Sequence, residues 1–66
     1  MMLNDLNMLK ARVASMMSNS EREFGVLVLA TKYGVSRIEM MLILKSLEKS
    51  EMVRRNPESD KWRYNN

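Results

Sequence analysis

The sequence of 66 residues contains no cysteine and no histidine, and only four of its residues are aromatic. The missing cysteines and histidines exclude disulfides, thiolate nucleophiles, imidazole bases and the usual zinc sites. A short secreted domain normally depends on disulfides for its stability, so their absence favours a cytoplasmic protein.

Features that support catalysis are also missing. The only two glycines, Gly25 and Gly34, do not form a glycine-rich phosphate-binding loop. The eight acidic residues are scattered over predicted helix caps and exposed faces, with no pair arranged for acid–base chemistry. We therefore expect no enzyme activity, no catalytic residues, no bound metal and no cofactor.

No long hydrophobic run is present. The longest, residues 24–30, is far shorter than the roughly 20 residues that span a bilayer. The N-terminus has no positively charged region ahead of an apolar stretch, so no signal peptide is predicted. We expect no membrane partner.

The remaining composition indicates one small folded domain over residues 1–66. Hydrophobic residues make up 45% of the chain, eight of them methionine. The net charge is +3, and the basic residues near the C-terminus outnumber the acidic ones, Glu58 and Asp60. A basic C-terminal segment favours nucleic acid as a partner. This basic cluster consists of Arg54, Arg55, Lys61 and Arg63.

A first helix is predicted near the N-terminus. Asn4 or Asp5 is expected to cap its start, and residues 18–20 to end it. Five apolar residues spaced by four and three fall on one face of this helix, which predicts a core face or, alternatively, a dimer seam. These residues are Met2, Leu6, Leu9, Val13 and Met16.

A second helix is predicted over residues 21–33. Ser20 and Glu23 have the spacing of a capping box at its start. Gly34 follows, and glycine suits the left-handed conformation that ends a helix.

A third helix is predicted over residues 37–50, because Ser36 and Glu39 form another capping box. The short link between the second and third helices requires a sharp corner. Counting 100° per residue places four apolar residues on the core side of the third helix: Met40, Ile43, Leu44 and Leu47. The opposite side holds Ile38, Leu42, Lys45 and Lys49, flanked by Arg37 and Met41.

Two strands, residues 52–55 and 61–64, are predicted to form a hairpin through a turn at residues 56–60. Asn-Pro at the start of the turn disfavours helix. Alternation along the second strand directs Trp62 and Tyr64 towards the helices, and Lys61 and Arg63 towards solvent.

The fold class predicted is therefore mainly α: a three-helix winged helix-turn-helix with a C-terminal two-stranded β-hairpin wing. Small Ala30 and Gly34 lie at the bend, surrounded by five apolar residues. These are Leu29, Tyr33, Val35, Met40 and Ile43. This pattern resembles the helix-turn-helix superfamily.

The stretch "MMLILKSLEKSEMVRRNP", residues 40–57, is similar to the small winged-helix regulators of enterobacterial fimbrial operons, the PapI and FaeA family. In both, a leucine-rich third helix continues through "LEK" into a wing that begins with Met-Val and a basic residue. The resemblance implies a small bacterial or phage transcriptional regulator that binds DNA, sometimes alongside a second regulator. The sequence departs from this at Met41 and Leu42, which offer no hydrogen bonds, so base-reading roles are not transferred to them.

Two functions follow as hypotheses. In the first, the chain binds double-stranded DNA to regulate transcription, using the third helix and the basic wing. Ser36 and Arg37 then meet phosphate at the helix start, and Ile38 or Met41 touches thymine methyl groups. Backbone phosphates are contacted by Lys45, Lys49 and the basic cluster: Arg54, Arg55, Lys61 and Arg63.

In the second hypothesis, the chain is a winged-helix protein-interaction module. Its contact surface is the apolar patch of Ile38, Met41 and Leu42, since exposed apolar patches usually mark partner sites. The partner is then a second copy in a homodimer or another regulatory protein.

Overall fold

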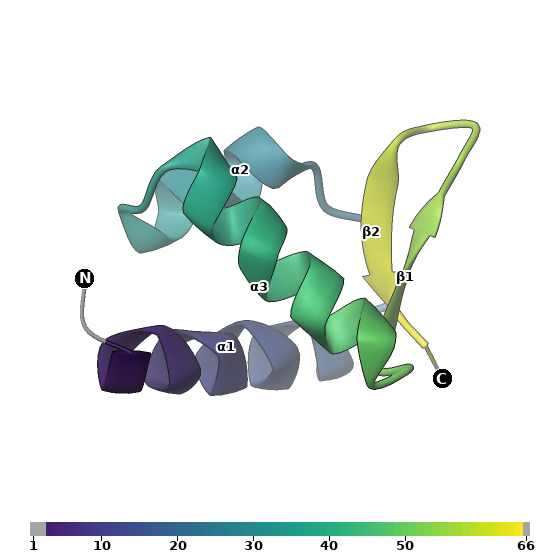
Figure 1. Ribbon diagram of the computed structural model, residues 1–66. Helices are drawn as coiled ribbons and strands as arrows, with labels where there is room; N and C mark the ends of the chain where they lie inside the picture. The colour runs from purple at the N-terminus through teal and green to yellow at the C-terminus, as the bar shows by residue number, and fades with distance from the viewer. Residues whose placement is uncertain (1–2, 66) are drawn as a thin grey trace.

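The computed structural model describes residues 3–65 of the chain. Three helices precede two strands: α1 (Leu3–Ser18), α2 (Val26–Tyr33), α3 (Arg37–Lys49), β1 (Val53–Asn56) and β2 (Lys61–Tyr64). Figure 1 shows α1 running along the base, α2 and α3 packed across it, and the hairpin standing at one end. The predicted mainly-α fold, with three helices and a C-terminal β-hairpin wing, is confirmed. Within residues 3–65, no helix combines the length and apolar character needed to cross a membrane.

The core lies where the three helices meet the hairpin. On α3 the structure buries the four residues predicted to face inward: Met40, Ile43, Leu44 and Leu47. The other buried core residues are Val13, Ala14, Met17, Leu29, Ala30, Val53 and Trp62. Because none of these is polar or charged except for the indole of Trp62, the core depends almost entirely on apolar burial.

On α1 the buried stripe is rotated slightly from the predicted one. Val13 is buried as expected, but Met17 is completely buried and Met16 only partly. The helix begins at Leu3, so Asn4 and Asp5 lie inside it instead of capping it. Met2, which was assigned to the same stripe, lies outside the described residues. The predicted end is confirmed, since α1 stops at Ser18.

The predicted start of α2 is wrong. The helix begins at Val26, and the Ser20 hydroxyl accepts a hydrogen bond from the amide of Arg22, not from that of Glu23. Phe24 is extended and forms two backbone hydrogen bonds with Trp62, of 2.7 and 2.8 Å. An extended backbone at this point gains a strand partner, which outweighs the local preference of the Ser20–Glu23 spacing for helix.

The corner between α2 and α3 follows the prediction. Gly34 adopts the left-handed conformation with φ of 68°, and its amide bonds the carbonyl of Thr31. The next amide, of Val35, bonds the carbonyl of Ala30 at 3.0 Å, completing a Schellman motif. Ser36 and Glu39 then form the predicted capping box, with both hydrogen bonds at 3.0 Å.

The hairpin differs from the prediction by one residue in its first strand. β1 begins at Val53, and Asn56 pairs with Lys61, which leaves residues 57–60 as the turn. The Asn56 side-chain oxygen accepts the amide of Glu58 at 3.0 Å, and Asp60 takes a left-handed φ of 59°. Such local bonds explain why Asn and Asp occupy this turn.

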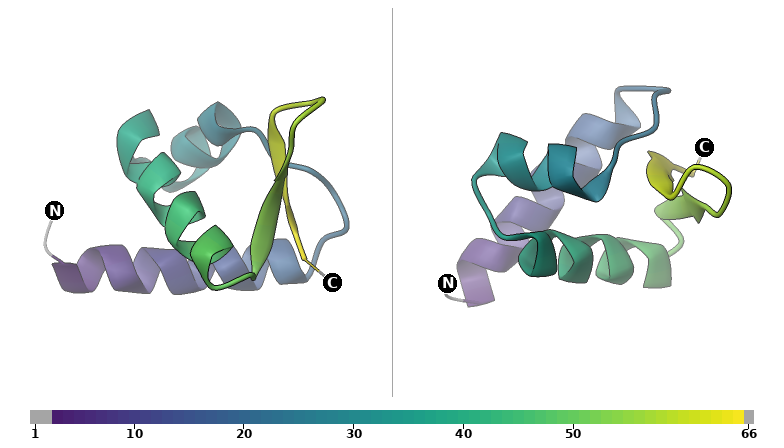
Figure 2. Two further views of the ribbon diagram at one scale, coloured as in Figure 1. Left: turned by 45° about the vertical axis from the view of Figure 1, so that its right-hand side comes forward. Right: turned by 90° about the horizontal axis from the view of Figure 1, so that it is seen from above.

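The wing, defined here as residues 53–64, has an additional partner. β2 pairs with β1 on one edge and with Phe24 on the other, so the loop after α1 forms a third short extended segment. Both views of Figure 2 show this loop passing beside the hairpin. The position of the wing is therefore fixed by contacts far apart in the sequence.

We predict that Gly34→Val lowers the free energy of unfolding by about 1–2 kcal/mol, measured by urea denaturation. The cause is the positive φ, because a Cβ at this position meets no heavy atom within 4 Å. Gly25→Ser is the matched control. Gly25 has an ordinary φ of −76° at the N-cap of α2, so this change should not destabilise the protein. Equal stability of Gly34→Val and wild type would contradict a strained turn.

Candidate nucleic-acid interface

The register of the hairpin sorts its basic residues between two faces. Cross-strand partners lie on the same face of a sheet, and successive residues alternate. Arg55 pairs with Trp62, whose side chain is fully buried, whereas Arg54 pairs with Arg63. The pleat therefore places Arg55 on the face of Trp62 and Arg54 and Arg63 on the other, although all three arginines line one hollow.

The outer face of the wing carries two arginines directly opposite each other. Like charges at directly opposed positions, with Cβ atoms about 5 Å apart, destabilise a hairpin unless an anion lies between or beside them. Arg54 is exposed and Arg63 is half-buried. Both line a shallow hollow of about 250 Å³, whose other lining residues are Glu23, Arg55, Asn56 and Pro57. We call Arg54 and Arg63 the arginine pair.

Glu23 is the acidic residue that lines the same hollow as the arginine pair, and its carboxylate is already engaged. Its carboxylate accepts hydrogen bonds from the Asn56 amide at 2.9 Å and from the Ser59 hydroxyl at 3.0 Å. These two bonds, with a smaller effect from the charges of Arg63 and Lys61, lower the pKa of Glu23 below its ordinary value of 4.5. Glu23 therefore ties the loop after α1 to the wing, and it only partly offsets the positive charge there.

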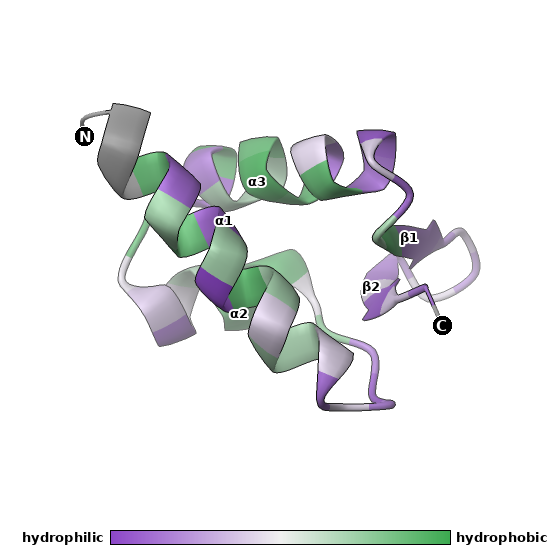
Figure 3. Ribbon diagram, turned by 90° about the horizontal axis from the view of Figure 1, so that it is seen from below, coloured by the Kyte–Doolittle hydropathy of each residue, from purple (hydrophilic) through white to green (hydrophobic). Residues whose placement is uncertain are grey.

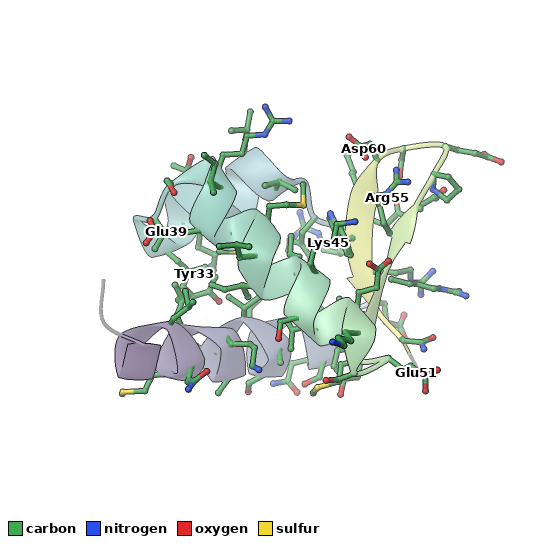
Figure 4. All side chains as sticks on the ribbon, viewed as in Figure 1. Tyr33, Glu39, Lys45, Glu51, Arg55 and Asp60 are labelled. Atoms are coloured by element: carbon green, nitrogen blue, oxygen red, sulfur yellow. The ribbon has the colours of Figure 1, made fainter. Side chains whose placement is uncertain are left out.

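Arg55 forms an ion pair that the sequence did not predict. Its guanidinium forms an ion pair with Asp60 at 2.9 Å, within the turn of the wing. Figure 4 shows Arg55 and Asp60 together near the tip of the hairpin. An exposed pair of this kind contributes little stability, but it neutralises part of the charge at the tip. Lys61, the fourth predicted cation, is exposed and shares the face of the arginine pair.

At the start of α3, the capping box changes the roles expected for two residues. Ser36 uses its amide and hydroxyl in the cap, and the carboxylate of Glu39 lies at the same helix end. This negative charge opposes the approach of a phosphate to Ser36. Arg37 is exposed and has no such restriction, so it is the better phosphate ligand of the two.

The outer side of α3 is apolar in its first half, as the sequence predicted. Ile38 is 74% exposed and Leu42 is 58% exposed, whereas Met41 is half-buried and packs against the core. Together with Arg37 they line a shallow hollow of about 320 Å³. In Figure 3, α3 changes from hydrophobic colours in its middle to hydrophilic at its C-terminal end.

The second half of the outer side is basic. Lys45 and Lys49 are exposed, and Lys45 lies 3.9 Å from the carboxylate of Glu48. The Lys45 ammonium is also 6.0 Å from the centre of the Trp62 ring, so it lies between α3 and the wing. The basic half of α3 and the wing therefore adjoin.

Two exposed residues on α2 were not predicted as part of any surface. Leu27 is 64% exposed and Val28 is 62% exposed, and they line a hollow with Arg37 and Met41. The available indication was the run of four apolar residues at 26–29, which cannot all face one side of a helix. The α2–α3 apolar face is defined as Leu27, Val28, Ile38, Met41 and Leu42.

The described residues offer no metal site. Among residues 3–65, no three histidine, cysteine, aspartate or glutamate side chains lie close enough together to hold a metal ion. The exposed cations of the wing and of the outer side of α3 are the candidate ligand contacts that remain.

No family model, no curated protein and no solved structure gives a significant match to the chain.

We predict that the free energy of unfolding falls below about pH 4.5, because two hydrogen-bonded carboxylates must then be protonated. The pKa of Glu39 is lowered by the backbone and hydroxyl of Ser36, and that of Glu23 by Asn56 and Ser59. A lowered pKa in the folded state stabilises the protein at higher pH, and this contribution is lost as the pH falls through the lowered value.

Urea denaturation as a function of pH checks this prediction. The double variant Glu23→Gln/Glu39→Gln should show a smaller decrease in acid than wild type. Glu58→Gln is the control, since the side chain of Glu58 makes no hydrogen bond to any described residue. An equal decrease in wild type and the double variant would show that these two groups do not cause it.

Proposed function

We propose that this chain is a small DNA-binding protein of winged-helix architecture that acts in transcription regulation. The observation that carries the proposal is the arginine pair. Two cross-strand arginines lie on the outer face of the wing, and the Glu23 carboxylate in the same hollow is occupied by Asn56 and Ser59, so this surface suits phosphate.

Further cations lie on neighbouring surfaces. Lys61 is on the same face of the wing as the arginine pair. Lys45 and Lys49 are exposed on α3, and the Lys45 ammonium is 6.0 Å from the centre of the Trp62 ring, on the other face of the wing. Arg37 lies at the other end of α3, beyond the apolar residues. A duplex presents phosphates on both sides of each groove, so cations at both ends of a helix and on a neighbouring hairpin match its charge pattern. The resemblance of residues 40–57 to the fimbrial operon regulators favours the same function.

We predict that Arg54→Ala/Arg63→Ala weakens binding to duplex DNA and flattens its salt dependence. Each neutralised phosphate contributes a slope of about −0.9 in a log–log plot of affinity against salt. The double variant should therefore lose about one to two units of slope. Fluorescence anisotropy over a series of salt concentrations measures both quantities.

Arg55→Ala is the matched control, because Arg55 belongs to the same strand but is paired with Asp60. Arg55→Ala should change the slope of the salt dependence less than replacing Arg54 or Arg63 with alanine does. If a folded Arg54→Ala/Arg63→Ala variant keeps the affinity and slope of wild type, the wing does not bind phosphate.

A second candidate function is protein contact through the α2–α3 apolar face. The observation that favours it is the extent of this face: Leu27 and Val28 add exposed apolar surface from a second helix, and Arg37 and Met41 line the hollows on both helices. A continuous apolar surface of this kind often marks a partner site. The occupant would be a second copy of the chain or another protein.

Leu42→Glu distinguishes the two functions, with Met8→Glu as a control of matched exposure on α1, since these residues are 58% and 59% exposed. If α3 enters the major groove, the new carboxylate faces phosphates and DNA affinity should fall, without a change in sedimentation coefficient. We expect this result. A shift of the sedimentation coefficient with unchanged DNA affinity would assign the face to protein contact.

A further inference from the structure

We infer that α3 recognises DNA through the 5-methyl groups of thymine, so that the protein prefers thymine-rich sites. The inference rests on the proposed DNA-binding function and specifies what the apolar half of α3 contacts. The exposed outer side of α3 carries apolar side chains at the positions where a helix in the major groove would contact bases.

The side chains at the middle of this surface cannot form hydrogen bonds. Ile38 and Leu42 are exposed by 74% and 58%, and Met41, which lines the same hollow, offers only a thioether. In the major groove, bases present donors, acceptors and one apolar group, which is the C5 methyl of thymine. An apolar helix face therefore has one base feature that it can bind favourably.

The spacing of the two exposed residues suits this contact. Ile38 and Leu42 are four residues apart on α3, so they lie about 6 Å from each other on one face of the helix. Neighbouring base pairs are about 3.4 Å apart along the duplex. The two side chains therefore reach methyl groups about two base pairs apart.

The charges around the apolar residues favour DNA over a second copy of the chain. Arg37 borders the hollow on one side, and Lys45 follows one turn after Met41. In a symmetric dimer these cations would crowd around one small interface, where like charges oppose association. Against a duplex, the same cations meet phosphates on the walls of the groove.

Replacement of thymine by uracil tests the inference, because it removes the 5-methyl group and leaves the hydrogen-bonding pattern of the base. The probes are two duplexes of alternating A·T pairs that differ only in this respect. Burial of one methyl group corresponds to about fourfold in affinity, so contact with two methyl groups predicts about 16-fold tighter binding of the thymine duplex. Fluorescence anisotropy at constant salt measures the ratio.

The variant Ile38→Ala/Leu42→Ala should reduce this ratio towards one, because its shorter side chains do not reach the methyl groups. It should also retain the melting temperature of wild type, because both residues are exposed. Met8→Ala, with 59% exposure on α1, is the matched control and should keep the ratio of wild type.

Three results would overturn the inference. Equal affinity for both duplexes, with salt-dependent binding that still requires the arginine pair, would refute methyl recognition and leave the proposed function intact. A ratio that persists in Ile38→Ala/Leu42→Ala would assign the preference to DNA shape. Absence of salt-dependent binding to any duplex would refute the proposed function as well.

Discussion

The burial of Trp62 is the constraint on which the rest of the structure depends. Its ring is fully buried against the helices, and its backbone bonds Phe24 on one edge while pairing with Arg55 on the other. Its indole N–H has no hydrogen-bond partner among the described residues, which costs about 1–3 kcal/mol. Burial of an aromatic ring of this size offsets that cost.

Placing Trp62 inward determines the distribution of charge on the wing. Because side chains alternate along a strand, Lys61 and Arg63 must face outward on either side of it. Register then adds Arg54 to that face and sends Arg55 to the other, where it pairs with Asp60. One buried side chain thus decides on which face of the wing each cation lies, although Arg54, Arg55 and Arg63 all line one hollow.

The α3 helix combines two apolar surfaces with different uses. Met40, Ile43, Leu44 and Leu47 are almost completely buried and form much of the core of this small domain. Ile38 and Leu42 are mostly exposed, so they contribute little to folding through burial. Their burial therefore does not explain their apolar character, and the proposed contact with DNA rests on this exposed part of α3.

The sequence by itself determined the local features. The Ser36–Glu39 capping box, the glycine after α2 and the 3.6-residue periodicity each involve residues within one or two helical turns, and they located α3, its buried face and the corner before it. Alternation along β2 likewise identified Trp62 as the inward residue. These patterns act over short distances, and no distant contact competes with them in α3 and β2.

Only the tertiary structure decided how distant segments combine. The spacing of Ser20 and Glu23 indicated a helix, but Phe24 gains a strand partner in Trp62, and Glu23 gains Asn56 and Ser59. The face on which each basic wing residue lies depended on the pairing register between β1 and β2. A shift of one residue would move every side chain of the strand to the opposite face. The exposed residues of α2 lie beside the apolar side of α3 because of the way in which the two helices cross. These outcomes depend on contacts between residues up to about 40 positions apart, and such contacts leave no pattern in a local stretch of sequence.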